Sequence, residues 1–254
     1  MIEQDEILAG IHAVTEALIA KRRHIIEIYY GGGKIVSPRI TKTLEMAYEQ
    51  GIAILEVPVS QLEKIAQTSL HQMIAARVST YPFFSNNTVD LLDIAARQNT
   101  SPFILFLDGI QDVHNLGAIL RTALCMGVDG VVIPKDRAAT ATPAVSRISA
   151  GALEHIRLVE VTNLAREINA VKEKGVWITG LLISGTMEIA NGNYTVPTGI
   201  VMGSEEKGIR SLVQRQCDFL CNIPQIKELN SMNVSVATAM ILYEVMRQRR
   251  YVIY

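Results

Sequence analysis

The chain has 254 residues, 49% hydrophobic and 19% charged, which is ample material for a core and shows no compositional sign of disorder. Its 24 Lys and Arg balance 25 Asp and Glu, and the net charge of −1 argues against a protein that coats nucleic acid non-specifically. The sequence has no run of about 18 apolar residues, so we expect no membrane span. The acidic first residues are not typical of a signal peptide. The three cysteines, an odd number, favour a reduced cytoplasmic protein.

The first third of the chain predicts a small α/β domain. Apolar residues at Leu8, Ile11, Val14 and Leu18 predict a helix over 8–20. The segments that follow predict a strand at 25–30, a helix near 38–50, a strand at 52–57 and a short helix at 60–66. The stretch at 78–84 ends this domain. We therefore expect a first domain over 1–83 and a linker over 84–98, whose turn-rich start at 85–88 leads into a helix at 89–97.

Residues 99–254 alternate apolar strands with helices. The predicted strands are 103–108, 131–134, 156–161, 176–183, 199–203 and 218–224. The predicted helices are 116–126, 143–153, 163–174, 209–216 and 233–250. This alternation predicts a mostly parallel sheet covered by helices on both faces.

Three segments of this second domain place polar residues just after a strand and before a helix. They are FILFLDGIQDVHNLGAILRTAL at 103–124, TGIVMGSEEKGIR at 198–210 and IPQIKELNSMNVSVATAMILYEVMRQR at 223–249. Such a turn presents free backbone N–H groups and polar side chains at one spot. In an α/β protein, ligands bind at this edge of the sheet.

Together the three segments resemble the signature motifs of the SpoU (TrmH-like) family of RNA ribose 2′-O-methyltransferases, in the SPOUT class. The residues that match are Asn115, Gly117 and Arg121 in the first motif, Gly203, Ser204, Glu205, Lys207 and Gly208 in the second, and Ile223, Pro224, Ser231, Asn233, Ser235 and Ala237 in the third. GIHAVTEAL at 10–18 and LHQMIAA at 70–76 resemble the N-terminal region of the bacterial 23S rRNA guanosine branch. The resemblance thus covers nearly the whole chain.

The resemblance implies a methyl transfer from S-adenosylmethionine to a ribose 2′-hydroxyl, without a metal. It also implies a deep trefoil knot in the C-terminal domain, a ribosomal-protein-like RNA-binding domain at 1–83, and a homodimer that uses the helix at 233–250. The expected substrate is a guanosine of 23S rRNA. A tRNA methyltransferase is the alternative within the class, and a catalytically silent RNA-binding or ribosome-assembly factor is the alternative outside it.

The family's functional positions fall into two sets here. The implied catalytic residues are Arg121, Asn115, Glu205, Ser231 and Asn233, and the implied donor-binding residues are Met202, Gly203, Ile223, Met232 and Val234. Arg121 would bind a phosphate and assist removal of the hydroxyl proton; because a guanidinium stays charged, stabilising the developing alkoxide is the safer physical role.

Each position also has a structural interpretation. Asn115 could be a helix N-cap, Ile223 and Met232 plain core residues, and Ser235 only a capping residue. Glu205 is expected to fix loop geometry through backbone N–H groups or an Arg, and His114 to be exposed. Two departures from the family pattern, Glu206 and Lys227 at usual glycine positions, leave the reaction class intact but put the substrate in doubt.

Overall fold

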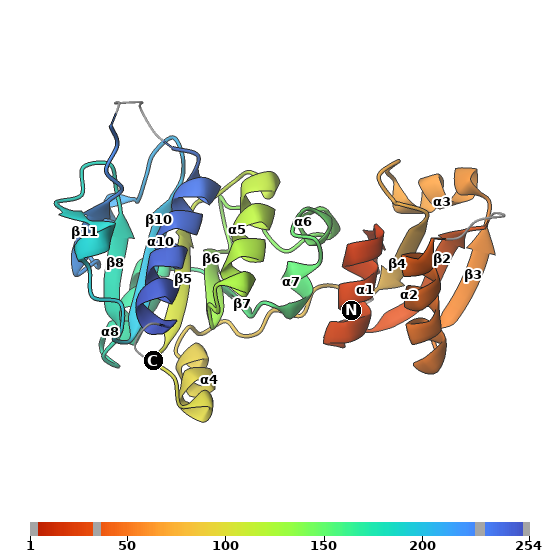
Figure 1. Cartoon of the computed structure of the whole chain (residues 1–254), viewed down its shortest axis with the longest axis horizontal. Coiled ribbons are helices and arrows are strands. Elements are labelled where there is room, and N and C mark those ends of the chain that lie inside the picture. The colour runs from red at the N-terminus through yellow and green to blue at the C-terminus, as the bar shows by residue number, and fades with distance from the viewer. Residues whose placement is uncertain (1–4, 33–36, 227–231, 251–254) are drawn as a thin grey trace. The chain divides into compact units, whose positions relative to one another are not determined.

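The computed structural model of the protein describes residues 5–32, 37–226 and 232–250. The chain folds into two compact units. Unit 1 comprises residues 1–82 together with 141–155, and unit 2 comprises 83–140 together with 156–254. The elements of unit 1 are β1 (Glu6–Ala9), α1 (Ile11–Ala20), β2 (Ile25–Gly31), α2 (Pro38–Glu49), β3 (Ala53–Val57), α3 (Val59–Ala66), β4 (Ile74–Val78), α6 (Pro143–Ile148) and α7 (Ala152–His155) (Figure 1).

Unit 1 is built on a four-stranded sheet in the order β1-β4-β2-β3, in which β2 and β3 are parallel and the other pairs antiparallel. The predicted helix over 8–20 is wrong at its start, because Leu8 and Ala9 belong to β1 and pair with β4. Gly10, at φ 101°, separates the strand from α1 in a conformation that side chains with a Cβ avoid. Leu8 and the apolar face of α1 share one buried core.

Residues 141–155 lie between two strands of unit 2 in sequence but belong to unit 1. The single helix predicted over 143–153 is two short helices, α6 and α7, separated by Ala150 at φ 53° and Gly151 at φ 84°. An added Cβ on Gly151 would lie 2.5 Å from the Glu16 Cβ of α1. The break therefore lets the segment approach α1 more closely than any other residue would allow.

Unit 2 contains a seven-stranded sheet in the order β7-β6-β5-β10-β8-β11-β9, and its strand pairs are parallel. Its elements are α4 (Asp90–Gln98), β5 (Phe103–Asp108), α5 (Val113–Cys125), β6 (Gly130–Pro134), β7 (Leu158–Val161), α8 (Leu164–Lys172), β8 (Trp177–Leu181), β9 (Met187–Glu188), the 3-10 turn η1 (Ile189–Asn191), β10 (Thr198–Gly203), α9 (Ser211–Gln214), β11 (Phe219–Asn222) and α10 (Val234–Arg250). The predicted α/β class with a mostly parallel C-terminal sheet is confirmed. The trefoil knot stays a prediction.

The two faces of this sheet are covered by different helices. Side chains of α4, α8 and α9 join those of the central strands in one buried core. Helices α5 and α10 lie side by side in front of the sheet in Figure 1. Residues 84–98, the expected linker, lie mostly in α4, and Leu91 is fully buried in that core. Among the described residues, none of the helices is long and apolar enough to cross a membrane.

Candidate active site

A cavity of about 540 Å³ lies at the carboxyl edge of the unit 2 sheet. Leu181, Gly203 and Ile223 line it from the ends of three neighbouring strands, β8, β10 and β11. Its complete lining is Leu181, Leu182, Ile183, Ser184, Met202, Gly203, Ser204, Glu205, Glu206, Gly208, Ile223, Gln225, Met232, Val234 and Ala237. All five donor-binding residues suggested by sequence, Met202, Gly203, Ile223, Met232 and Val234, therefore lie around one cavity. The 181–184 stretch, which sequence reasoning missed, forms another wall.

Gly203 is required by the protein backbone around it. The Ser204 N–H donates to the Gly208 carbonyl at 3.1 Å, and the Gly208 N–H donates to the Ser204 carbonyl at 2.8 Å, which closes a tight loop. An added Cβ on Gly203 would lie 2.0 Å from the Gly208 carbonyl carbon. Glycine at 203 therefore allows the close approach of the loop of residues 204–208, which itself forms part of the cavity wall.

Three side chains from the three motifs form a hydrogen-bonded network at this edge. The Asn115 amide donates to Glu205 Oε1 at 2.6 Å, and the Asn233 amide donates to Asn115 Oδ1 at 3.0 Å and to Glu205 Oε1 at 3.1 Å. Asn115 is buried, whereas Glu205 and Asn233 are exposed. The network thus ties α5, the 204–208 loop and the start of α10 together beside the cavity.

The backbone places each member of this network. Asp112, not Asn115, caps α5, because its carboxylate accepts from the His114 N–H at 2.8 Å; Asn115 therefore lies inside the helix. Asn233 precedes α10, and its Oδ1 accepts from the Ser235 N–H at 2.9 Å. The Ser235 hydroxyl donates to the same oxygen. Glu205 accepts side-chain amides in place of the expected backbone N–H groups or Arg.

A second polar connection was not found from sequence. The Asp108 carboxylate, at the end of β5 and 1% exposed, accepts from the Arg210 N–H at 2.7 Å and from its Nε at 2.7 Å. The two residues are 102 positions apart, so no local spacing relates them. An Asp that ends a fully buried strand is the one sequence signal that could have indicated it. This pair fixes the chain that leaves the 204–208 loop.

Arg121 lies in the second half of α5. It is six residues beyond Asn115, which corresponds to about 240° around a helix, so the two side chains project from different faces. Arg121 is exposed, and its guanidinium has neither a hydrogen bond nor an ion pair to any residue that the structure describes. His114 is exposed, as expected. Ser231 and Lys227 lie outside the described residues.

The cavity fits S-adenosylmethionine by size and chemistry. Sites for small molecules range from roughly 300 to 1,000 Å³ and are lined mainly by apolar residues with a few polar groups. Here, Met202, Ile223 and Val234 supply apolar surface, and the carboxylates of Glu205 and Glu206 favour a cationic ligand. Among the described residues, there is no group of three or more His, Cys, Asp or Glu that could hold a metal ion.

Comparisons with known proteins agree with this geometry. Residues 102–243 match the model of the SpoU rRNA methylase family, and residues 7–84 match the model of the RNA 2′-O ribose methyltransferase substrate-binding domain. The chain is 38% identical over 249 residues to a putative TrmH family tRNA/rRNA methyltransferase, YacO, of Bacillus subtilis, covering 98% of each chain. It is also 38% identical over 249 residues to the 23S rRNA (guanosine-2′-O-)-methyltransferase RlmB of Shewanella oneidensis, covering 98% of this chain and 100% of the relative.

The fold has solved counterparts. The SpoU methyltransferase AviRb of Streptomyces viridochromogenes, crystallised with AdoMet, superposes with a TM-score of 0.80 at 21% identity, covering 97% of this chain and 91% of the other. The match to the family model, on a parallel sheet with a cavity at its carboxyl edge, places the chain in the class of SpoU methyltransferases. The chain belongs to the SpoU rRNA methylase family. It is an RNA ribose 2′-O-methyltransferase, and its methyl donor is S-adenosylmethionine.

Proposed function

We propose that this chain methylates the 2′-hydroxyl of a guanosine in 23S rRNA. The support for rRNA is the full-length similarity to relatives with that printed activity, in Shewanella oneidensis and Pseudomonas putida. The observation that carries the reaction is the Asn115–Glu205–Asn233 network beside a cavity that fits the donor. The proposed place of action is the cytoplasm.

In this proposal, the Asn115–Glu205–Asn233 network fixes the positions of α5, the 204–208 loop and the start of α10 at the active site. The donor supplies a methyl group already activated by its sulfonium, so positioning of the ribose accounts for much of the rate. Asn115 and Asn233 present amides that orient Glu205, and Ser231 completes the set from the third motif. Arg121, with no intramolecular partner among the described residues, binds a phosphate of the target nucleotide and stabilises the developing alkoxide.

The domains divide the work. We assign RNA recognition to residues 1–83, which overlap the match to the substrate-binding model, and catalysis to 99–254, with 84–98 connecting them. Separating these roles lets the donor bind without RNA. Titration of the full chain with the donor should therefore show binding by calorimetry in the absence of RNA. The same binding should be seen when the RNA target is added.

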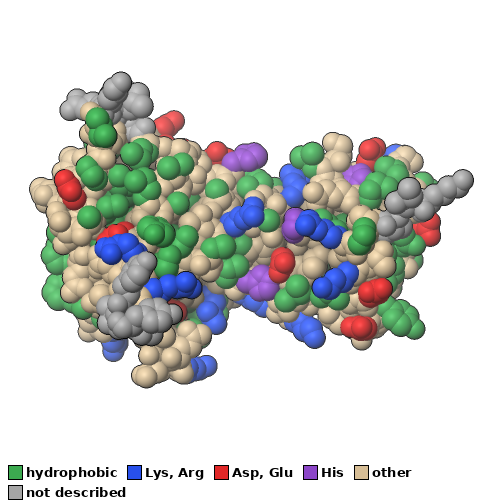
Figure 2. Space-filling view, viewed as in Figure 1, with side chains coloured by type: hydrophobic (Ala, Val, Ile, Leu, Met, Phe, Trp, Pro, Cys, Tyr) green, Lys and Arg blue, Asp and Glu red, His purple; other side chains and the backbone are tan. Residues whose placement is uncertain are grey.

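We also propose a homodimer that uses α10. Val236, Met240 and Tyr243 are spaced four and three residues apart on α10 and are 53%, 40% and 52% exposed. Leu124 of the adjacent α5 is 37% exposed. Figure 2 shows hydrophobic side chains, in green, gathered over α10. Apolar residues that a helix does not bury in its own core are typical of an interface. In such a dimer, Arg121 could complete the partner's site. Light scattering at micromolar concentration tests this proposal, and a mass near the 28.0 kDa of one chain would contradict it.

The target is tested by mapping 2′-O-methyl sites in RNA from cells with and without the gene. Loss of one methylated guanosine in 23S rRNA, restored by the wild-type chain and not by Arg121→Ala, is the expected result. Loss of a tRNA methyl group would favour the tRNA alternative, in line with the tRNA/rRNA name of the Bacillus relative. Unchanged methylation of both RNAs, together with absent donor binding, would favour the silent factor.

A further inference from the structure

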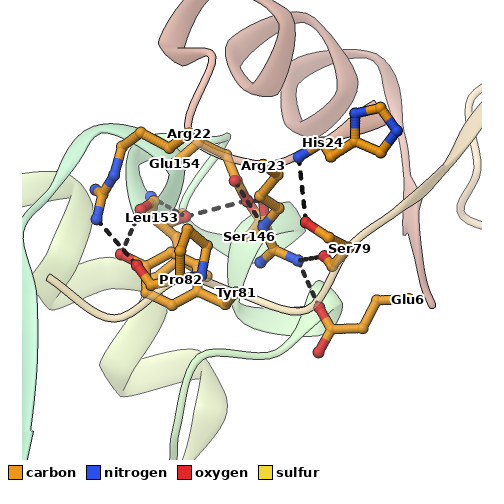
Figure 3. Close-up of polar contacts among 11 residues, drawn as sticks. Glu6, Arg22, Arg23, His24, Ser79, Tyr81, Pro82, Ser146, Leu153 and Glu154 are labelled. Carbon is orange, nitrogen blue, oxygen red and sulfur yellow. Dashed lines mark hydrogen bonds and ion pairs between the residues drawn. The ribbon is translucent and has the colours of Figure 1, made fainter. Parts of the chain in front are cut away.

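The short helices α6 and α7 are attached to unit 1 by buried polar contacts. The Arg23 side chain is 0% exposed and lies with its Nε 2.9 Å from the Glu154 carboxylate of α7, which is 1% exposed. A second carboxylate, Glu6, accepts from Arg23 Nη1 (Figure 3). The Ser146 hydroxyl of α6 donates to Glu154 at 2.7 Å. Removing Arg23 leaves the buried Glu154 carboxylate without a cationic partner, which is strongly destabilising, whereas removing Glu154 leaves Arg23 paired with Glu6 alone.

Further contacts hold the same segment. The Tyr81 ring lies 5.1 Å from the Arg23 guanidinium carbon, and its hydroxyl donates to the Leu153 carbonyl at 3.2 Å. His155 and Glu16 are linked at 2.7 Å. Burial raises the pKa of the Glu154 carboxyl, and the neighbouring Arg23 opposes that rise. These contacts come from α1, from β1 and from Tyr81, which follows β4. Residues 141–155 are therefore part of the unit 1 core rather than a loop that rests on it.

The chain that enters this segment from unit 2 touches the start of the first catalytic motif. Residues 135–140 connect β6 to α6, and within them the Ala139 N–H donates to the Ile110 carbonyl at 2.7 Å. Both residues are more than 90% buried. Ile110 lies two residues before Asp112, the cap of α5, and Asn115 follows in that helix. Few residues of the chain therefore separate the start of α6 from the backbone that places Asn115.

We propose that residues 141–155 carry the position of the RNA-binding unit to the catalytic edge, with Arg23 and Glu154 as positioning residues for methyl transfer. The inference rests on the proposed role of unit 1 in RNA recognition. Neither side chain touches the reacting groups; both act through α6, the Ala139–Ile110 contact and Asn115. RNA that seats correctly on unit 1 then favours the productive arrangement of the network.

The test compares Glu154→Gln, which keeps the size of the side chain and removes its charge, with a matched control, Arg77→Met. Arg77 pairs with Glu27 inside the unit 1 sheet at 2.6 Å, and this ion pair does not involve residues 141–155. We would measure donor affinity by calorimetry, kcat and KM for the RNA that the wild-type chain methylates, and hydrogen exchange of residues 109–116.

For Glu154→Gln we expect kcat for RNA to fall about tenfold, donor affinity to stay within twofold, and exchange of 109–116 to rise. Because Arg77 lies in the unit to which we assign RNA recognition, its control readouts exclude KM: we expect Arg77→Met to leave donor affinity, kcat and the exchange of 109–116 near wild type. The inference is overturned if exchange of 109–116 is unchanged, if Arg77→Met shows the same defects, or if only KM changes. Should Glu154→Gln fail to fold, Tyr81→Phe, which removes the bond to the Leu153 carbonyl and keeps the ring, is judged by the same measurements.

The two hypotheses fail in different ways. A wild-type chain without RNA methylation would remove the proposed function, whereas the exchange of residues 109–116 tests the coupling without any RNA. A positive exchange result with an inactive wild type would keep the structural connection and discard its catalytic meaning, which overturns the assignment of Arg23 and Glu154 as positioning residues.

Discussion

Replacing Asn233 tests the polar network most directly. In Asn233→Ala, α10 loses its capping oxygen, which is worth about 1 kcal/mol. The Oδ1 of the buried Asn115 also loses its donor, and an unpaired buried acceptor costs about 1 kcal/mol or more. We therefore expect a loss of about 2 kcal/mol in the free energy of unfolding, or about 4–8 °C in Tm for a unit of this size. The rate of methyl transfer should also fall, because Glu205 loses one of the two amides that orient it.

A second variant separates capping from orientation. Asn233→Asp keeps an oxygen that can cap α10 but places a second carboxylate where the amide lay 3.1 Å from Glu205 Oε1. Both positions are exposed, so the repulsion is screened and modest. Repulsion raises the pKa of the new carboxyl above its unfolded value of about 3.9. The variant is thus least stable above the raised pKa, and its stability relative to wild type improves as the pH falls toward the unfolded pKa.

The assays are urea unfolding from about pH 7 down to about pH 4, a range that approaches the unfolded pKa of about 3.9, and methylation of the target RNA at each pH. Asn233→Asp should recover part of its stability and activity as the pH is lowered, since the protonated group can again donate to Asn115. Asn233→Ala should show no such recovery. Equal behaviour of the two variants at all pH values, or wild-type activity in Asn233→Ala, would refute the role of the network.

Two further variants address single positions. Arg121→Ala should lower turnover at least about a hundredfold, as expected for loss of a group that stabilises developing charge, with Tm and donor affinity near wild type; turnover within a few-fold of wild type would remove Arg121 from the mechanism. Gly203→Ala should abolish donor binding in calorimetry, because the new methyl group would lie 2.0 Å from the Gly208 carbonyl carbon and deform the cavity wall. The control Gly127→Ala, at an open surface turn, should leave donor binding unchanged. Normal donor affinity in Gly203→Ala would show that the 204–208 loop adjusts without consequence.

Sequence reasoning located the active-site edge because parallel strands bring their carboxyl ends together. Polar residues after β5, β10 and β11 were therefore expected near each other, and Asn115, Glu205 and Asn233 do meet there. The direction of each side chain was less predictable. Arg121 lies on another face of α5 than Asn115, and the Asp108–Arg210 pair joins positions that no short-range pattern relates.

The helices α6 and α7 show why the core that buries the apolar face of a helix is hard to predict from sequence. The apolar residues of 143–153 predict a helix with a buried face, and Val145 and Leu153 are indeed fully buried. Periodicity does not say which core does the burying. In the structure that core belongs to unit 1, through a buried Arg23–Glu154 pair whose members are 131 positions apart by residue number (154 minus 23). A prediction that divides the chain into consecutive domains assigns residues 141–155 to the second domain, because they lie within it in sequence. In the structure they belong to unit 1.

This arrangement leads to a last prediction, on truncation. Removing residues 1–82 alone uncovers Val145 and Leu153, worth about 1.5–3 kcal/mol each, and leaves the buried Glu154 without Arg23. A matched truncation that also replaces 141–155 with a short Gly/Ser linker removes this liability. We expect the first protein to aggregate or to unfold at lower temperature, and the second to be monodisperse and to bind donor like the full chain, because the cavity is lined by residues of unit 2. If the simple deletion is as stable and as monodisperse as the matched one, α6 and α7 do not depend on unit 1 for their cover.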